Sequence, residues 1–382
     1  MSCTVDNSIF EKLHKNESWL YTNVSALSTI TFQDNEDAHA EFVELYDISK
    51  NSPFVVFVNG IFQENASRLS GSITINTGSG EVAKRSDSQI PRGACDGVHI
   101  TGTQQKTIHV LQIVAGEAPV ACYGSVFIHA NEGESISVAE TNVGIGNCDH
   151  LLMPCTEVIA EKNSSVTIVR AIRGSKKAYH LSSLHVEQHE SSKVQTHTLT
   201  LAGKRTRNEV YAYLDGKDCE SNFDGMYMLG QDQLVDNHLR VEHNMPGGNS
   251  REFYKGILDK NAKSVFTGRI YVKEDAQQTD AKQTNQNILL TDDAEAFARP
   301  QLEIYADDVA CTHGATTGEI DDEAMLYLQT RGIPADAAKT LLIYAFLNES
   351  LDELTDDEFR SNLVEELLSN LPGGEFIREL YL

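Results

Sequence analysis

The sequence lacks the short motifs that mark most self-sufficient enzymes. It contains no GxxxxGK[ST] phosphate-binding loop, no GxSxG nucleophile elbow, no HExxH zinc helix and no dinucleotide-binding fingerprint. Acidic pairs occur at Asp292-Asp293 and Asp307-Asp308, but both lie near turns, where solvated carboxylates are the ordinary interpretation. The chain is therefore predicted to be no enzyme by itself, and in particular not to hydrolyse ATP.

Cysteines are few and widely spaced, and the sequence has no CxxC pair and no paired Cys/His knuckle. Neither a disulfide framework nor a structural zinc site is therefore indicated. A buried, inert thiol is the ordinary interpretation of each one taken alone. The seven cysteines stand at positions 3, 95, 122, 148, 155, 219 and 311.

Positive charge and long apolar runs are also scarce. The chain has 31 Lys and Arg against 56 Asp and Glu, a net charge of −25 that predicts no nucleic-acid partner. No window approaches the roughly 18 apolar residues of a membrane helix, so no membrane association is expected. The opening MSCTVDNSIFEKLHKNES has no basic leader followed by an apolar run, which favours a cytoplasmic location. The net negative charge of the chain would favour solubility or attract a partner or a metal ion.

Residues 51–315 are predicted to form β-structure throughout. Runs such as SITINTG, SSVTIVRAI and KVQTHTLTLAG alternate β-branched with polar residues, and turn signals such as Asp215-Gly216 separate them. Val194, Val210, Met226 and Val241 open successive runs about 15 residues apart. This pattern fits either a β-sandwich or a β-solenoid, and the absence of a clean sequence repeat leaves both open.

The two ends of the chain differ from this middle. Residues 1–50 are predicted to be a short mixed segment, in which Ile9, Phe10 and Leu13 could line a short helix. Residues 316–382 are predicted to be a small helical domain. Its first helix has an apolar face at Ile320, Ala324 and Leu328 and stops at Gly332.

Two further helices complete the predicted C-terminal domain. The first carries one apolar stripe, and a capping box at Thr355-Asp356-Asp357-Glu358 opens the second. Because so small a module cannot bury all its apolar surface, we expect part of that surface to face the β domain or a partner. The stripe residues are Ala338, Leu341, Leu342, Ala345 and Phe346, followed on the next helix by Phe359, Leu363 and Leu367.

Histidine supplies the candidate metal chemistry. His185 and His189 could share one face of a strand, although satisfied surface or core histidines are the common case. The sharpest cluster is Ala310-Cys311-Thr312-His313-Gly314. Residues two apart on an extended segment point the same way, and a thiol with an imidazole suits iron, zinc or copper. The alternative is that Cys311 and His313 simply pack side by side.

The segment from Tyr254 to Ile333 resembles the SufD family. The residues that carry the resemblance are YKGILD, VFTGRIYV, AQQTDAKQTNQNILL and PQLEIYADDVACTHGATTGEIDDEAMLYLQTRGI, with LVDNHLRVEH and ESWLYTNVSAL upstream. The related SufB proteins typically read H-E-A-T where this chain has His313-Gly314-Ala315-Thr316, which favours SufD. Many relatives carry a longer helical N-terminal region than this chain does.

The resemblance implies a right-handed parallel β-helix core with a helical C-terminal domain, in a mainly β protein. It implies a non-catalytic subunit of a scaffold that assembles iron–sulfur clusters, pairing with a SufB-like homologue at the end of the β-helix. The C-terminal helices, with the stripe residues above, would bind a SufC-like ATPase. His313 would be the functional histidine with Cys311 beside it. No cofactor would be stably bound by the chain alone; iron or a cluster would bind transiently in the complex. The isolated chain could pair with itself.

Two enzyme hypotheses compete with the scaffold hypothesis. A secreted β-helix acting on polysaccharide would need a leader and a carboxylate- or arginine-lined groove. A cupin-like metal enzyme would need a compact set of His and Glu ligands inside one barrel, whereas the histidines of this chain are scattered.

Overall fold

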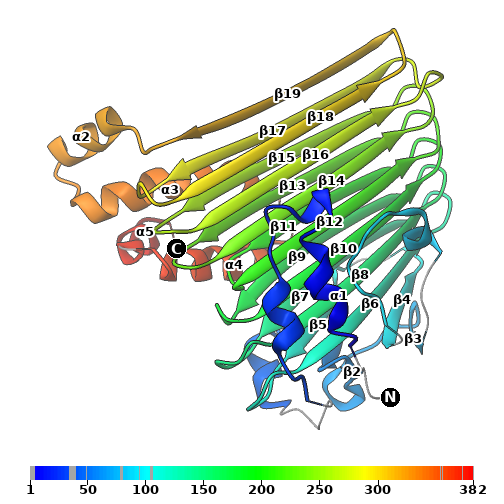
Figure 1. Ribbon diagram of the computed structural model, residues 1–382, viewed down its shortest axis with the longest axis horizontal. Coiled ribbons are helices and arrows are strands. Elements are labelled where there is room, and N and C mark those ends of the chain that lie inside the picture. Colours follow the sequence, from blue (N-terminus) through cyan, green and yellow to red (C-terminus); the bar gives the residue numbers. More distant parts are fainter. Residues whose placement is uncertain are drawn as a thin grey trace.

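The computed structural model describes residues 5–33, 40–48, 50–77, 81–93, 95–103, 106–352, 354, 356–371 and 373–381. Cys3 and Thr355, the latter the first residue of the predicted capping box, lie outside them. The described chain is mainly β, with a helical N-terminal segment and C-terminal helices (Figure 1).

From β4 onward, consecutive strands alternate between two sheets. One sheet contains β1, β2 and the odd-numbered strands from β5, and the other contains β3 and the even-numbered strands from β4. Neighbours within each sheet run parallel except β1 with β2 and β3 with β4. A β-sandwich of antiparallel Greek keys is thereby excluded, and the predicted parallel β-helix is confirmed. The sheet of odd strands, with β2 at its end, contains β1 (Phe54–Val58), β2 (Ile61–Phe62), β5 (Ile108–Val114), β7 (Ser135–Gly144), β9 (Ser165–Gly174), β11 (Lys193–Thr200), β13 (Glu220–Leu229), β15 (Asn249–Leu258), β17 (Thr279–Leu289) and β19 (Val309–Gly318). The even sheet contains β3 (Ile73–Thr77), β4 (Asp96–Thr101), β6 (Ala121–Ala130), β8 (Leu151–Ala160), β10 (Tyr179–Gln188), β12 (Arg205–Leu214), β14 (Leu234–His243), β16 (Lys263–Val272) and β18 (Glu295–Ile304).

Each turn of the solenoid, or rung, contributes one strand to each sheet. The runs opened by Val194, Val210, Met226 and Val241 are the consecutive strands β11 to β14, so their spacing is half a rung. Alternate side chains point between the sheets and stack on the equivalent residue of the next rung. One such interior column of the even sheet runs through Ile128, Val158, Val186, Ala212, Val241 and Ile270.

From β6 to β17, the same backbone conformation recurs once per rung at one corner of the solenoid. There, the turn from an even strand to the next odd strand contains a residue with positive φ, which glycine, asparagine and aspartate adopt most readily. The residue types at this corner differ from rung to rung. They are Gly133, Asn163, Ser191, Asp218, Gly247 and Gln278.

The N-terminal segment covers the outer face of the even sheet. Trp19 is fully buried there, and the guanidinium carbon of Arg207 on β12 lies 4.2 Å from its ring centroid. Arg207 is itself buried between Glu209 and Asp236, and it donates to the Ser18 carbonyl at 2.8 Å. The segment is thus fixed by stacking and by an ion-pair network. Its elements are α1 (Ser8–Leu13), η1 (Glu17–Trp19), η2 (Ser25–Thr29) and η3 (Ala40–Leu45), and η4 (Glu64–Ala66) and η5 (Val82–Arg85) follow among the first strands.

The C-terminal helices cover the outer face of the odd sheet. Ile343 and Leu347 of α3 and Leu363 of α4 pack in one cluster with sheet residues such as Val169 and Ile257. The helix α2 instead projects from the body, next to the end of β19 (Figure 1). The bounds are α2 (Asp322–Thr330), α3 (Ala335–Leu351), α4 (Asp357–Ser369) and α5 (Gly374–Tyr381).

Asp356 caps α4 and anchors it to the sheet. Its side chain accepts from the Phe359 amide at 2.9 Å and lies 3.5 Å from Nε2 of His109 on β5. His109 and the capped amide lower the pKa of Asp356 to about 2. Asp356→Ala should lower the free energy of unfolding by about 1 kcal/mol, as loss of an N-cap does. Chemical denaturation at neutral pH measures this, with the exposed neighbour Asp357→Ala as control; equal effects of the two substitutions would contradict the capping role.

Candidate functional site

The last rung of the solenoid leaves two strand edges open. Among the described residues, β18 pairs only with β16 and β19 only with β17, so each has one edge without a neighbouring strand. Both strands are ten residues long; β19 is largely exposed, and the residues of β18 are half-buried or exposed. In Figure 1, β19 runs along the border of the molecule away from the N-terminal strands. Unpaired edges of this length are templates for pairing with another chain.

Cys311 and His313 lie on β19, both on the side that faces between the two sheets. Cys311 is in register with buried Ala281 of β17, and His313 with Gln283. Cys311 is partly buried against the apolar cluster of Ile270 and Val272, and this burial raises the pKa of its thiol. The imidazole of His313 is exposed. Within the described chain, no group of three or more His, Cys, Asp and Glu side chains is arranged to hold a metal ion.

Beneath His313 the interior of the solenoid is polar. Gln283 on the preceding rung donates at 2.5 Å to Glu252, which lies one rung deeper and in register with it. Gly268 on β16 leaves room for this pair, since a Cβ there would lie 1.9 Å from Gln283 Nε2. Burial raises the pKa of Glu252 to about 7 against the ordinary 4.5. His313 therefore stands at the open end of a polar column that includes a titrating carboxyl group.

Glu252 should make the stability of the chain fall with rising pH. Between pH 4.5 and pH 7 the folded state binds more protons at this carboxyl than the unfolded state, so stability is lost as the pH rises through 7. Glu252→Gln removes this loss, which is on the order of 3 kcal/mol. We expect the variant to be more stable than the parent at pH 8 and the gain to shrink steadily toward pH 5. Denaturant titrations across this range test it; a gain independent of pH would contradict the assignment.

The other predicted histidine pair is not brought together on a strand. His185 lies within β10, buried and stacked on Tyr211 with ring centroids 5.4 Å apart. Desolvation, with nearby Arg92 and Arg170, lowers its pKa to about 3. His189 follows the strand in a turn, where its Nε2 lies 3.3 Å from Glu187. Both fit the interpretation of core and surface histidines.

The predicted partner-binding stripe lies mostly inside the protein. Phe359, Leu363 and Leu367 are fully buried and hold α4 against the chain's own core, and Ala338 is also buried. Of the rest, Leu341, Leu342 and Phe346 are partly buried and Ala345 is exposed. Their role toward a partner stays a prediction. In the structure, the buried stripe residues attach the C-terminal helices to the odd sheet.

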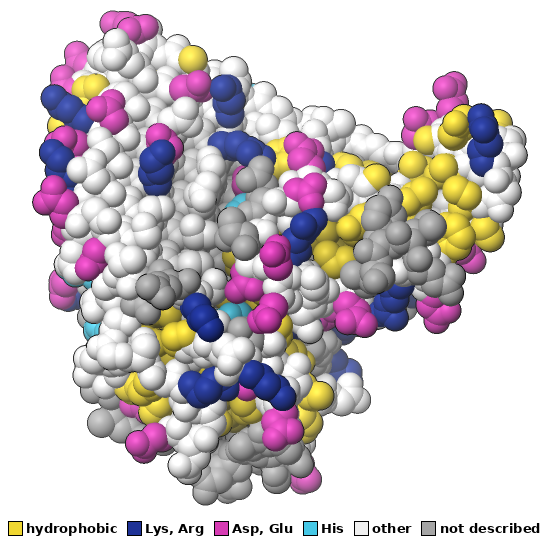
Figure 2. Space-filling model, turned by 180° about the vertical axis from the view of Figure 1, so that it is seen from behind, with side chains coloured by type: hydrophobic (Ala, Val, Ile, Leu, Met, Phe, Trp, Pro, Cys, Tyr) yellow, Lys and Arg dark blue, Asp and Glu magenta, His cyan; other side chains and the backbone are white. Residues whose placement is uncertain are grey.

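A different apolar surface is exposed on α2. Leu326 and Tyr327 are 62% and 58% exposed, and Arg331 stacks over the Tyr327 ring at 5.1 Å. Figure 2 shows hydrophobic side chains gathered on this projecting arm. Sequence analysis missed the pair because it searched α2 for its core-facing side, where Ala324 and Leu328 are indeed half-buried. The signal was present: the run MLYL is apolar on more than one face.

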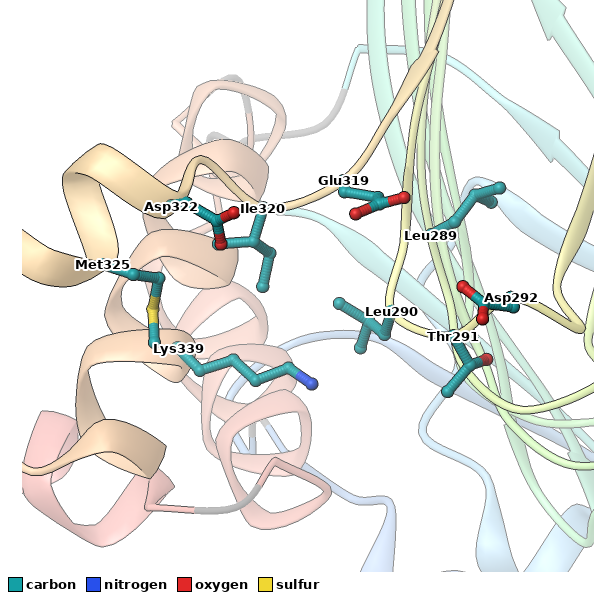
Figure 3. Close-up of a pocket in the computed structure, with 9 residues that line it drawn as sticks. All are labelled: Leu289, Leu290, Thr291, Asp292, Glu319, Ile320, Asp322, Met325 and Lys339. Carbon is teal, nitrogen blue, oxygen red and sulfur yellow. The ribbon is translucent and has the colours of Figure 1, made fainter.

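A cavity of about 230 Å³ separates the root of this arm from the solenoid. Leu290 and Asp292 line it from the loop after β17, and Glu319, Met325 and Lys339 line it from the helical side (Figure 3). Only Glu319, Ile320 and Asp321 connect β19 to α2. The strand that carries His313 is thus joined directly to a helix that packs loosely at its root.

Known proteins were compared with the chain. Residues 112–346 match the model of the SUF system FeS cluster assembly SufBD core domain. The chain is 31% identical to the iron–sulfur cluster assembly protein SufD of Escherichia coli over 267 residues, which cover 70% of this chain and 63% of that protein. It is 26% identical to a SufBD family protein of Synechocystis over 89% of this chain and 83% of the relative. It is also 30% identical to the Arabidopsis thaliana protein ABCI7, chloroplastic, over 62% of this chain and 50% of the relative.

The match to the family model extends from β5 into α3 and includes the terminal rung with its Cys311 and His313. The chain belongs to the SufBD family of iron–sulfur cluster assembly proteins.

Proposed function

We propose that this chain is a non-catalytic, SufD-like scaffold subunit that pairs with a SufB-like homologue through its terminal rung. The observation that carries this proposal is the pair of open edges on β18 and β19. Backbone amides and carbonyls along such edges gain hydrogen bonds when a second β-helix continues the stack. In its absence, a second copy of the chain could occupy the same edges, which would produce the homodimer expected of the isolated subunit.

His313 is proposed to bind iron or a nascent cluster, as cargo, at this interface. A neutral imidazole is a good ligand for iron, and His313 is exposed at the end that the partner would cover. The partner would supply the further ligands. Cys311 is the weaker candidate, because a metal ligand must be a thiolate and burial raises the pKa of this thiol. Sharing ligands between two chains suits a cluster that must later be released.

The C-terminal arm is proposed to bind a SufC-like ATPase, with Leu326 and Tyr327 as its apolar contacts. Exposed aromatic and aliphatic side chains on a projecting helix are typical anchors of protein interfaces. The three-residue connection from β19 to α2 would then join the ATPase to the strand that carries His313. A displacement of α2 would pull on the edge of the assembly site.

The cytoplasmic location and the absence of nucleic-acid and membrane partners remain part of the proposal. The net charge of −25 disfavours nucleic acid. None of the described helices is long and apolar enough to cross a bilayer. One relative, from Arabidopsis thaliana, is named as chloroplastic.

Co-expression tests the proposal directly. The chain should co-purify with a SufB-like and a SufC-like protein, and the complex handled without oxygen should carry the absorption of an iron–sulfur cluster. The isolated chain should show no such absorption. Failure to form the complex, or turnover of a polysaccharide by the isolated chain, would contradict the proposal.

A further inference from the structure

Three arginines converge on the outer face of the even sheet, close to the terminal rung. Arg240 and Arg269 are in register on β14 and β16, and Arg299 lies on β18, in register with Thr267. Neighbouring strands of a sheet are about 4.8 Å apart, so two guanidinium groups repel each other across this pair. Together with residues of the N-terminal segment, the three arginines line a cavity of about 250 Å³.

Four carboxylates contact the three arginines, two from outside the cavity lining and two from within it. Arg240 contacts Glu242 at 2.7 Å, and Arg269 contacts Glu303 at 2.7 Å, both outside the cavity lining. Inside the lining, Asp87 lies 3.4 Å from Arg240, and Glu17 lies 3.1 Å from Arg299. The side chains of Asp87 and Glu17 are 69% and 83% exposed, and exposed ion pairs of this kind contribute little and exchange readily with solvent.

Several polar atoms in this cluster are left without a partner. Within the described chain, Nε of Arg240, Nε of Arg269 and Nδ1 of His238 are shielded from solvent and make no hydrogen bond. His238 lines the cavity beside the arginines. Burial, followed by the positive charges of Arg207, Arg299, Arg240 and Arg269, lowers its pKa to about 3. The cavity lining itself therefore holds three arginines against two carboxylates, Glu17 and Asp87, on a chain whose net charge is −25.

We propose that this cavity, the arginine pocket, binds a small multivalent oxyanion such as phosphate or a small polycarboxylate. Guanidinium groups bind such anions through paired, charge-assisted hydrogen bonds. The volume is below the range of pockets that hold drug-sized ligands, so a single small anion fits better than a nucleotide. The pocket is separate from His313 and does not depend on the proposed scaffold function.

Calorimetric titration of the full chain tests this, with inorganic phosphate and citrate as separate probes and chloride to hold the ionic strength constant. We expect saturable one-site binding of at least one probe, and the stronger probe identifies the anion class. Arg269→Gln should weaken binding about tenfold or more. Arg331→Gln on the distant α2 makes the same charge change and should leave binding unaltered.

If Arg269→Gln does not fold, Arg299→Gln replaces it, since Arg299 contacts only the exposed Glu17 and the ring of Tyr21 among the interactions described. The proposal is overturned if neither probe binds saturably. It is also overturned if Arg331→Gln weakens binding as much as the pocket variant, because the effect would then be one of net charge.

Discussion

His313→Ala should abolish cluster formation and leave the complex intact. The imidazole is exposed, so its removal should change the free energy of unfolding by no more than about 0.5 kcal/mol. The pairing of β18 and β19 with a partner would use backbone groups, which the substitution does not touch. Loss of a ligand should nevertheless reduce cluster content by about tenfold or more. Complex yield and cluster absorption, measured in one anaerobic preparation, check this.

Two further variants sharpen the His313 experiment. Cys311→Ala should have the milder effect, because that thiol packs against an apolar cluster and its raised pKa disfavours the thiolate. His14→Ala removes an exposed histidine from the N-terminal segment and should have no effect. If His313→Ala reduced complex yield and cluster content equally, the residue would be structural. If it reduced neither, the cluster site would lie elsewhere.

The double variant Leu326→Glu with Tyr327→Gln should lose the ATPase and keep the SufB-like partner. Both side chains point away from the core of the arm, and both replacements are good helix formers, so α2 should stay folded. Truncating an interface anchor typically costs about 2 kcal/mol or more, so losing both would weaken binding by roughly several hundredfold. Co-purification and titration with the isolated ATPase measure the loss.

A point substitution is preferable here to removal of the helical domain. Deletion beyond Gly318 would also remove α3 and α4, and it would uncover Val169, Leu199 and Ile257 on the odd sheet. Leu20→Glu is the matched control, since Leu20 is 61% exposed on the N-terminal segment far along the chain from α2. Unchanged ATPase binding in the double variant would place the contact elsewhere, first of all at the half-exposed Leu342 and Phe346.

The β content could be predicted from the sequence, but the solenoid could not be predicted from periodicity alone. The corner that repeats along the solenoid from β6 onward is occupied in turn by Gly133, Asn163, Ser191, Asp218 and Gly247. At each of these positions the residue tolerates positive φ or a local constraint enforces it. The positions share no residue type, so the repeat is not recognisable in the sequence. Interior columns likewise accept valine, isoleucine or alanine. Only the resemblance to a family distinguished the β-helix from a sandwich.

The candidate site was likewise predicted from the sequence only in part. The shared orientation of Cys311 and His313 followed from strand alternation. The open edge beside them did not, because strand pairing is a property of the whole stack. The apolar stripe on α3 and α4 was recognised as apolar, but a hydrophobic pattern does not distinguish a face that packs on its own sheet from one that awaits a partner. Burial assigns Phe359 to the first class, whereas Tyr327 on α2, which the stripe did not include, is exposed.

The one-sided pairing of β19 has a consequence for the energetics of assembly. In a solenoid each rung is stabilised by its two neighbours, so stability behaves as a sum of nearest-neighbour terms along a line. The terminal rung has only one such term, and Val309–Gly318 should therefore open locally at a lower free energy than any interior strand. Docking of a second β-helix would convert this end rung into an interior one. Much of the binding free energy would then appear as folding free energy of the strand that holds His313, so the site would become rigid only once the partner is in place.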